Sequence, residues 1–140
     1  MVEQKIEEKV LTKKDIFEKA NKSLSLRYVN VPEWGGKVFY VPMTMKERRE
    51  IRKKCSTVEL DPMTGEQATT LDAELFEIWA IIYCCRDPRS PDHRIFDPGD
   101  VQFLSEKMAA GPISHVATEI MKASGMAPNA LKRGEEGTLT

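Results

Sequence analysis

Residues 70–86 read TLDAELFEIWAIIYCCR, and their apolar side chains recur with the spacing of a helix. The side chains that form this wide apolar stripe are Leu71, Leu75, Phe76, Ile78, Trp79, Ile82, Tyr83 and Cys85. A helix that is apolar over so much of its surface is buried on several sides. We therefore expect a helix over residues 70–86, begun by Thr69 or Thr70, to form the centre of the hydrophobic core.

Sequence signals for helix ends place three further helices around this segment. Thr44 and Glu47 have the spacing of a capping box, which predicts a helix over residues 44–56. The sequence DPGD at 97–100 predicts a helix over residues 98–110, with Asp97 as its N-cap. Pro112 is expected to begin a last helix over residues 112–124, and Gly125 is expected to follow it as the C′ residue.

Residues 24–41 predict a β-hairpin rather than a helix. Leu24, Leu26 and Tyr28 alternate with other residues, and KVFYV at 37–41 is a second run that favours a strand. The sequence between them, PEWGG at 32–36, favours a turn, because glycine adopts positive φ without steric cost. Residues 59–66 and 87–92 are expected to be loops. The predicted fold class is α+β, a mostly α-helical small bundle with an N-terminal β-hairpin.

The chain length of 140 residues is that of one domain. We expect residues 1–11 to form a flexible or frayed helical arm and residues 12–125 to form a single domain. Residues 126–140 are expected to be a mobile tail. A short helix is also expected to begin at Thr12 and to end near Asn21.

Composition argues against several classes of function. The chain has 21 Lys and Arg against 22 Asp and Glu, a net charge of -1, so it has no overall field that would attract DNA or an anionic membrane. Three cysteines are too few for a disulfide scaffold. No apolar run approaches the roughly 20 residues of a membrane span. A soluble, cytosolic protein is expected.

No residue pattern predicts catalysis. Cys84 and Cys85 are adjacent on the predicted helix and would point about 100° apart, which is unsuited to binding one metal ion. A buried structural role is favoured for both. His93 and His115 belong to no recognised catalytic motif. We expect no enzymatic activity, no cofactor and no metal site.

The helix at 44–56 carries candidate partner-binding residues. Six positive residues lie between positions 46 and 54, and Arg48, Arg49 and Arg52 are the candidates among them. They could contact phosphates or an acidic protein partner. A solvated helix face is the alternative.

The predicted hairpin carries a second candidate group, Trp34, Phe39 and Tyr40. Tryptophan is enriched among interface hot spots, so Trp34 could anchor another chain. The alternative is that its ring folds back over the hairpin.

Five segments follow one another in a recognisable order: LTKKDIF at 11–17, VPEWGGKV at 31–38, TMKERR at 44–49, RIFDPGDVQFL at 94–104 and SGM at 124–126. This order resembles that of the small tail assembly chaperones of long-tailed bacteriophages and prophages. The resemblance covers residues 11–126. The chain departs from the family pattern at residues 87–93, where its loop is longer and richer in proline, and over the first eleven residues.

The resemblance implies a non-enzymatic protein that binds the tape-measure protein, keeps it soluble and recruits tail tube subunits. It also implies a place in the host bacterial cytoplasm, absence from the mature virion and, as in many such proteins, a longer product made by ribosomal frameshifting. Self-association is a further expectation, whereas contact with nucleic acid or membrane is not expected. One alternative is another phage morphogenesis or virion protein, such as a head–tail connector or a tail completion factor. The other is a small nucleic-acid-binding regulator that uses the basic helix.

Overall fold

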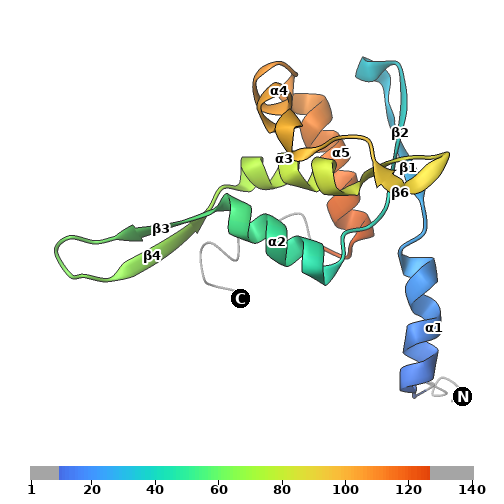
Figure 1. Ribbon diagram of the computed structural model, residues 1–140, viewed down its shortest axis with the longest axis horizontal. Coiled ribbons are helices and arrows are strands. Elements are labelled where there is room, and N and C mark those ends of the chain that lie inside the picture. Colours follow the sequence, from blue (N-terminus) through green and yellow to red (C-terminus); the bar gives the residue numbers. More distant parts are fainter. Residues whose placement is uncertain (1–9, 127–140) are drawn as a thin grey trace, which may run out of the picture.

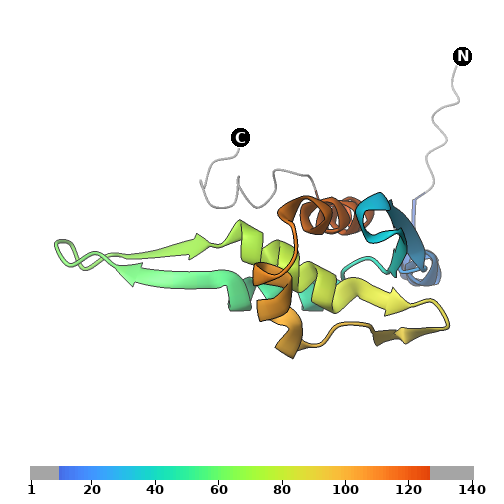
Figure 2. The same ribbon diagram turned by 90° about the horizontal axis from the view of Figure 1, so that it is seen from above.

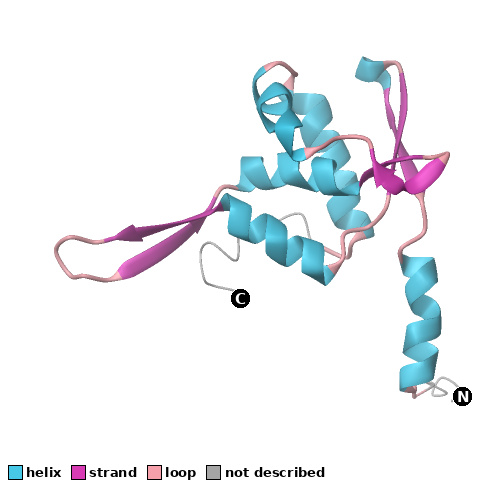
Figure 3. Ribbon diagram, in the orientation of Figure 1, coloured by secondary structure: helices cyan, strands magenta, loops and turns pink. Residues whose placement is uncertain are grey.

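Helices and short antiparallel strands alternate along the computed structural model, which describes residues 10–126 (Figures 1 and 3). Helices account for 51% and strands for 24% of these residues, which confirms the α+β class. Over the same range, no helix is both long and apolar enough to cross a membrane. Apart from residues 10, 11 and 126, the predicted N-terminal arm and C-terminal tail lie outside the described residues.

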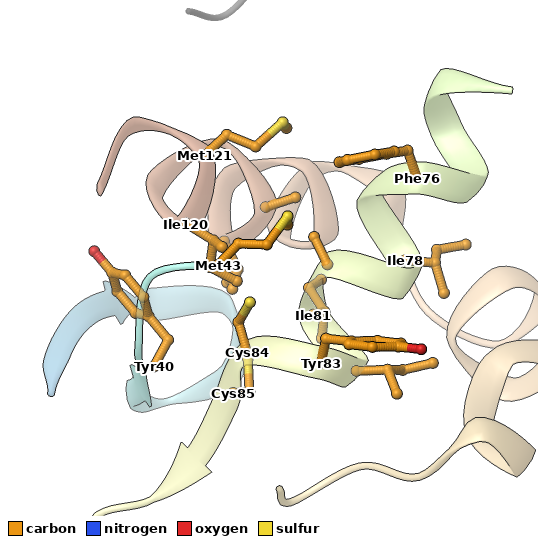
Figure 4. Close-up of a cluster of buried hydrophobic side chains, with 14 of the residues drawn as sticks. Tyr40, Met43, Phe76, Ile78, Ile81, Tyr83, Cys84, Cys85, Ile120 and Met121 are labelled. Atoms are coloured by element: carbon orange, nitrogen blue, oxygen red, sulfur yellow. The ribbon is translucent and has the colours of Figure 1, made fainter. Parts of the chain in front are cut away.

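The hydrophobic core lies where α3 (Ala73–Cys84) packs against α5 (Ala110–Ala123) and α2 (Met45–Cys55). Figure 4 shows side chains of α3 and α5 meeting those of Tyr40 and Met43. The buried side chains of α3 are Phe76, Ile78, Ala80, Ile81, Ile82, Tyr83 and Cys84, and those of α5 are Pro112, Ile113, Val116, Ala117, Ile120 and Met121. The expectation that residues 70–86 supply the centre of the core is confirmed.

The predicted hairpin forms one half of a four-stranded sheet. Strands β1 (Arg27–Val31) and β2 (Gly36–Tyr40) pair antiparallel, with Val29 opposite Val38. A short 3₁₀-helix, η2 (Pro32–Trp34), forms the tip, and Gly35 follows it at φ 77°. Beyond β2 lie β5 (Cys85–Asp87) and β6 (Ser90–Arg94), which give the order β1-β2-β5-β6. The prediction of a loop at 87–92 is therefore wrong.

A second strand pair was not predicted, since residues 59–66 were expected to be a loop and the next helix was expected to begin at Thr69 or Thr70. Strands β3 (Ser56–Leu60) and β4 (Gln67–Leu71) form a two-stranded ribbon that joins α2 to α3 and extends away from the helices (Figures 1 and 2). Asp61 N–H closes the turn by donating to the carbonyl of Glu66 at 2.8 Å. Since β4 runs to Leu71, Thr69 and Thr70 cannot begin α3. Its N-cap is Asp72, whose carboxylate accepts from the N–H of Leu75 at 3.0 Å.

The helix at 44–56 agrees closely with its prediction. Thr44 is its N-cap, and the side chains of Thr44 and Glu47 each accept a hydrogen bond from the other residue's backbone N–H.

The helix predicted over 98–110 is shorter than expected. A turn of 3₁₀-helix, η3 (Pro98–Asp100), precedes α4 (Val101–Glu106), and Asp97 caps the turn as predicted.

The last helix, α5, begins at Ala110, two residues before the predicted start. Gly111 and Pro112 thus lie in its first turn, where the missing N–H of proline leaves no helical hydrogen bond unmade. At its other end Gly125 has φ 79°, and Met126 N–H donates to the carbonyl of Met121 at 2.8 Å. This arrangement is a Schellman motif, and it confirms Gly125 as the C′ residue.

The first helix, α1 (Lys13–Ser23), stands apart from the rest of the molecule. A capping box between Thr12 and Asp15 begins it, and it runs two residues further than predicted. No other helix or strand of the described part packs along it. Figures 1 and 2 place α1 and the β3–β4 ribbon at opposite ends of an elongated molecule.

Candidate functional site

The three aromatic residues predicted to bind a partner do not share one surface. Phe39 and Tyr40 are neighbours on β2, so their side chains point to opposite faces of the sheet. Tyr40 is 5% exposed and belongs to the core, where burial, with Glu119 nearby, raises its pKa. Trp34 at the hairpin tip is half-buried and packs against the core cluster. Tyr40 is therefore a core residue, and Trp34 is held partly against the core rather than fully in solvent.

The outer face of the hairpin carries an aromatic patch that sequence reasoning did not identify. Tyr28 lies opposite Phe39 in the register, and their ring centroids are 5.7 Å apart. Lys37 Nζ lies 4.3 Å from the centroid of the Tyr28 ring. Of the predicted aromatic residues, Phe39 alone contributes to this patch.

The predicted arginines of α2 have different surroundings. Arg49 is exposed, whereas Arg48 and Arg52 are half-buried one turn apart. Their Nε atoms are buried and have no hydrogen-bond partner among the described residues. The pKa of Arg52 is lowered, mainly because the side chain is partly buried and secondly because the positive charge of Arg48 is nearby. The Nε atoms are too buried for a group from outside the chain to reach, so a carboxylate or phosphate would bind through the Nη atoms of these half-buried side chains, with charge-assisted hydrogen bonds.

Glu47, at the start of the same helix, forms ion pairs with two other arginines. Its Oε2 lies 3.3 Å from Nη2 of Arg94 and 3.7 Å from Nη2 of Arg86, and its side chain is 15% exposed. Arg86 also donates to the carbonyls of Pro91 and Tyr83. The Glu47 cluster (Glu47, Arg86 and Arg94) thus fastens the start of α2 to strands β5 and β6.

The β3–β4 ribbon carries large apolar side chains in solvent. Val58 is 62% exposed, Leu60 63% and Met63, in the turn, 89%. The register places Val58 opposite Thr69 and Leu60 opposite Gln67, which puts Val58 and Leu60 on one face. In the described part neither ribbon strand pairs with any other strand. Alternation in STVEL at 56–60 was the available sequence signal for β3.

Helix α1 also exposes apolar side chains. Ile16 is 52% exposed and Phe17 65%, and Leu24 just after the helix is 42% exposed. Lys13 Nζ lies 5.7 Å from the centroid of the Phe17 ring. Helical spacing brings Ile16, Phe17 and Ala20 to one side.

A groove of about 310 Å³ lies between α3, α4 and α5. Its apolar lining consists of Leu75, Ile78, Leu104, Met108, Ala110 and Ile113. Its polar lining consists of Asp72, Glu74, Glu77, Ser105 and Ser114. Ser114 Oγ donates to Oε1 of Glu77 at 2.8 Å, which joins α5 to α3 beside the groove.

The cysteines and histidines have structural surroundings. Cys55, Cys84 and Cys85 are free thiols in the core, and burial raises the pKa of each. His93 is exposed on β6, and His115 Nε2 lies 3.2 Å from the carbonyl oxygen of Asn30. Residues 10–126 contain no group of three His, Cys, Asp or Glu side chains arranged to hold a metal ion.

Comparison of the chain with protein-family models, with curated proteins and with solved structures returned no match.

Proposed function

We propose that this protein is a non-enzymatic tail assembly chaperone of a long-tailed bacteriophage or prophage. It binds the tape-measure protein, keeps that protein soluble and recruits tail tube subunits during tail assembly. The order of short motifs between residues 11 and 126 suggests this function, and one structural observation supports it most. Two elements at opposite ends of the molecule, α1 and the β3–β4 ribbon, hold large apolar side chains in solvent.

Exposed apolar groups of this kind suit a protein that holds other apolar segments. Soluble monomers rarely leave such groups together on the surface unless another molecule covers them. The ribbon offers Val58 and Leu60 on one face and the flexible Met63 at its tip, and methionine adapts to surfaces of varied shape. In this proposal the apolar face of the ribbon contacts the long hydrophobic helices of the tape-measure protein.

The half-buried arginines of α2 supply a polar contact in the same proposal. Arg48 and Arg52, with exposed Arg49 beside them, bind an acidic segment of a tape-measure or tail tube subunit. The contact involves few residues, which suits a chaperone that must release its client. The protein then acts in the host bacterial cytoplasm and is absent from the mature virion.

Co-expression tests the proposal directly. The protein is produced together with the tape-measure and tail tube proteins from the same phage or prophage genome, and soluble complexes are isolated by pull-down and sized. We expect soluble tape-measure protein only when this chain is present. A tape-measure protein that is equally soluble alone, with this chain unbound beside it, would overturn the proposal.

Two alternatives predict different results. A head–tail connector or tail completion factor remains in the particle, so mass spectrometry of purified virions would detect it. A small nucleic-acid-binding regulator would use the half-buried Arg48 and Arg52, with exposed Arg49 beside them, to bind phosphates. Its affinity for DNA or RNA would fall steeply with salt, because phosphate contacts release counterions.

A further inference from the structure

We infer that the free edge of strand β4 binds an extended basic segment of another protein, which adds a third strand to the β3–β4 ribbon. The ribbon has two strands, and in the described part of the chain neither of them pairs with any other strand. One side of β4 therefore presents backbone N–H and C=O groups for which the described residues supply no partner strand. Two strands alone are marginal in water, so a third strand would stabilise the ribbon.

The hydrogen bonds at the two ends of the ribbon show which backbone groups face this edge. At one end Asp61 N–H donates to the carbonyl of Glu66 at 2.8 Å. At the other end Asp72 N–H donates to the carbonyl of Cys55 at 2.9 Å. Hydrogen-bonded and non-hydrogen-bonded pairs alternate along an antiparallel ladder between these ends. The backbone groups of β4 that point outward to the free edge are therefore those of Gln67, Thr69 and Leu71.

The edges of the four-stranded sheet are protected, whereas the edge of β4 is not. Edge strand β6 contains Pro91 and charged residues, which are usual means of preventing further strand pairing. Edge strand β1 lies beside α5, where His115 Nε2 is 3.2 Å from the carbonyl oxygen of Asn30. Strand β4, with the sequence QATTL, has no charged residue and no proline, and its first four residues are exposed. It is thus an open template for another strand.

Charge identifies the kind of strand that fits. The ribbon and its turn carry Glu59, Asp61 and Glu66, and no Lys or Arg lies between residues 55 and 85. The ribbon of a second copy would bring the same carboxylates and would be repelled, whereas a strand that carries Lys or Arg would be attracted. The occupant is therefore a basic segment of a different protein. Addition of an extended segment to a sheet edge is a recurring mode of recognition.

The two faces of the ribbon define the side-chain pattern of the third strand. Val58, Leu60 and Leu71 lie on one face. Glu59 and Ala68 lie opposite each other on the other face. Because neighbouring strands are about 4.8 Å apart, a lysine of the third strand would start about 10 Å from Glu59 and would reach it over the small side chain of Ala68. The bound segment thus alternates apolar residues on the first face with Lys or Arg on the second.

This pairing does not depend on the proposed function, because it uses the edge of the ribbon rather than its apolar face. It can be measured with the full chain and a peptide alone. The probe is a fluorescently labelled peptide of about ten residues in which Val alternates with Lys. We expect saturable binding by fluorescence anisotropy, and weaker binding as the salt is raised from about 0.05 M to about 0.5 M, because salt screens the attraction between lysines and carboxylates.

Amide hydrogen exchange followed by NMR locates the bound peptide. The outward N–H groups of Gln67 and Thr69 should exchange more slowly once the peptide is bound. The N–H groups of Ala68 and Thr70 point toward β3 and should change less. This alternation along one strand is specific to pairing at the edge, since a peptide lying across either face would not produce it.

Two control peptides separate backbone pairing from charge. One carries N-methyl groups on successive residues, which removes N–H donors from both of its edges and leaves its lysines in place. The other has Glu at each Lys position. Each should bind at least about tenfold more weakly than the first peptide.

Proline substitution tests the contact from the side of the chain. Thr69→Pro removes an outward N–H and no hydrogen bond between β3 and β4, and proline is tolerated on an edge strand at such a position. It should lower the affinity at least about tenfold, whereas the matched control Thr69→Ser keeps the N–H and should change the affinity less than about twofold. Gln67→Pro is a second blocking variant, nearer to the turn. Circular dichroism verifies that each variant is folded.

Binding that requires the backbone N–H groups of the peptide, its lysines and the edge of β4 would support the inference. A probe that does not bind at about 1 mM would overturn it. So would an N-methylated peptide that binds as tightly, or folded proline variants that both bind like wild type. Slow exchange of the outward N–H groups in the chain alone, increasing with its concentration, would also overturn it, because copies of the chain would then occupy the edge.

Discussion

Glu47 joins three elements of this fold, α2, β5 and β6. Its Oε1 accepts from the backbone N–H of Thr44 and its Oε2 faces Arg86 and Arg94. One carboxylate therefore caps α2 and forms ion pairs with two arginines, Arg86 on β5 and Arg94 on β6. Its side chain is 15% exposed and that of Arg86 is 13% exposed, so water screens these charges weakly.

Replacing Glu47 by Gln should destabilise the protein by about 1–3 kcal/mol, because half-buried Arg86 and exposed Arg94 would lose their counter-charge. Glutamine retains an oxygen that can accept the capping hydrogen bond from Thr44, so the change isolates the charge. Urea unfolding followed by circular dichroism measures the difference. Glu59→Gln, on the exposed ribbon, is the control. Equal stability of the two variants would show that the Glu47 cluster contributes nothing through its charge.

The buried thiols give a prediction for pH dependence. Burial raises the pKa of Cys55 and of Cys85 from 9.0 to about 12. The folded state thus holds the proton where the unfolded chain releases it, and this contribution to stability is complete below pH 9 and is lost as pH rises toward 12. At neutral pH a thiol reagent should label none of the three cysteines in the folded protein and all three in denaturant. Rapid labelling of folded protein would contradict their burial.

Caps and registers decide where the elements of this molecule begin and end. Leu71 and Cys85 have the helical spacing of α3 in the sequence, yet Leu71 lies on β4 and Cys85 on β5. Asp72 ends the ribbon and begins the helix, since its carboxylate accepts from Leu75 N–H.

Asp72→Ala should therefore cost about 1 kcal/mol of stability, as the loss of an N-cap typically does. Thr70→Ala should cost only a few tenths, because Thr70 is exposed on β4 and its side chain meets only Thr57 across the ribbon at 3.4 Å. Chemical unfolding of the two variants distinguishes the two candidate caps. A larger loss for Thr70→Ala would place the helix start where the sequence alone suggested.

Local signals explain which elements could be predicted. The caps at Thr44 and Asp97 and the C′ glycine at 125 depend on interactions within a few residues, and all three are confirmed. Strand β6 was missed because Pro91 argues against a strand. It lies at the edge of the sheet, where a missing N–H is tolerated. The ribbon was missed because residues 59–66 were assigned to one loop and the residues from Thr69 onward were assigned to the helix that follows.

The candidate surfaces required the fold. Sequence periodicity places Arg48 and Arg52 on one side of α2, but their burial depends on the elements packed around them. The sequence also contains Val58, Leu60 and Phe17 as ordinary apolar residues. Only the tertiary structure shows that nothing in the described part of the chain covers them.

At the scale of the whole molecule, the core is separate from the two elements that expose apolar side chains. The centre is closed around α3 and α5, whereas α1 and the ribbon extend from opposite ends with their apolar side chains in solvent (Figure 1). Changes at the ends should leave the core intact, so binding and stability can be tested independently.

The chaperone proposal is tested most directly by the soluble fraction of the tape-measure protein on co-expression. Wild type is compared with two variants of the ribbon. In the ribbon variant Val58, Leu60 and Met63 are changed to Ser. In the control Thr57, Ala68 and Thr70, which lie on the opposite face of the same ribbon, are changed to Ser. We predict that wild type and control keep the tape-measure protein soluble and that the ribbon variant, folded by circular dichroism, loses most of this effect. A tape-measure protein that is as soluble with the ribbon variant, or with no partner, as with wild type would contradict the account.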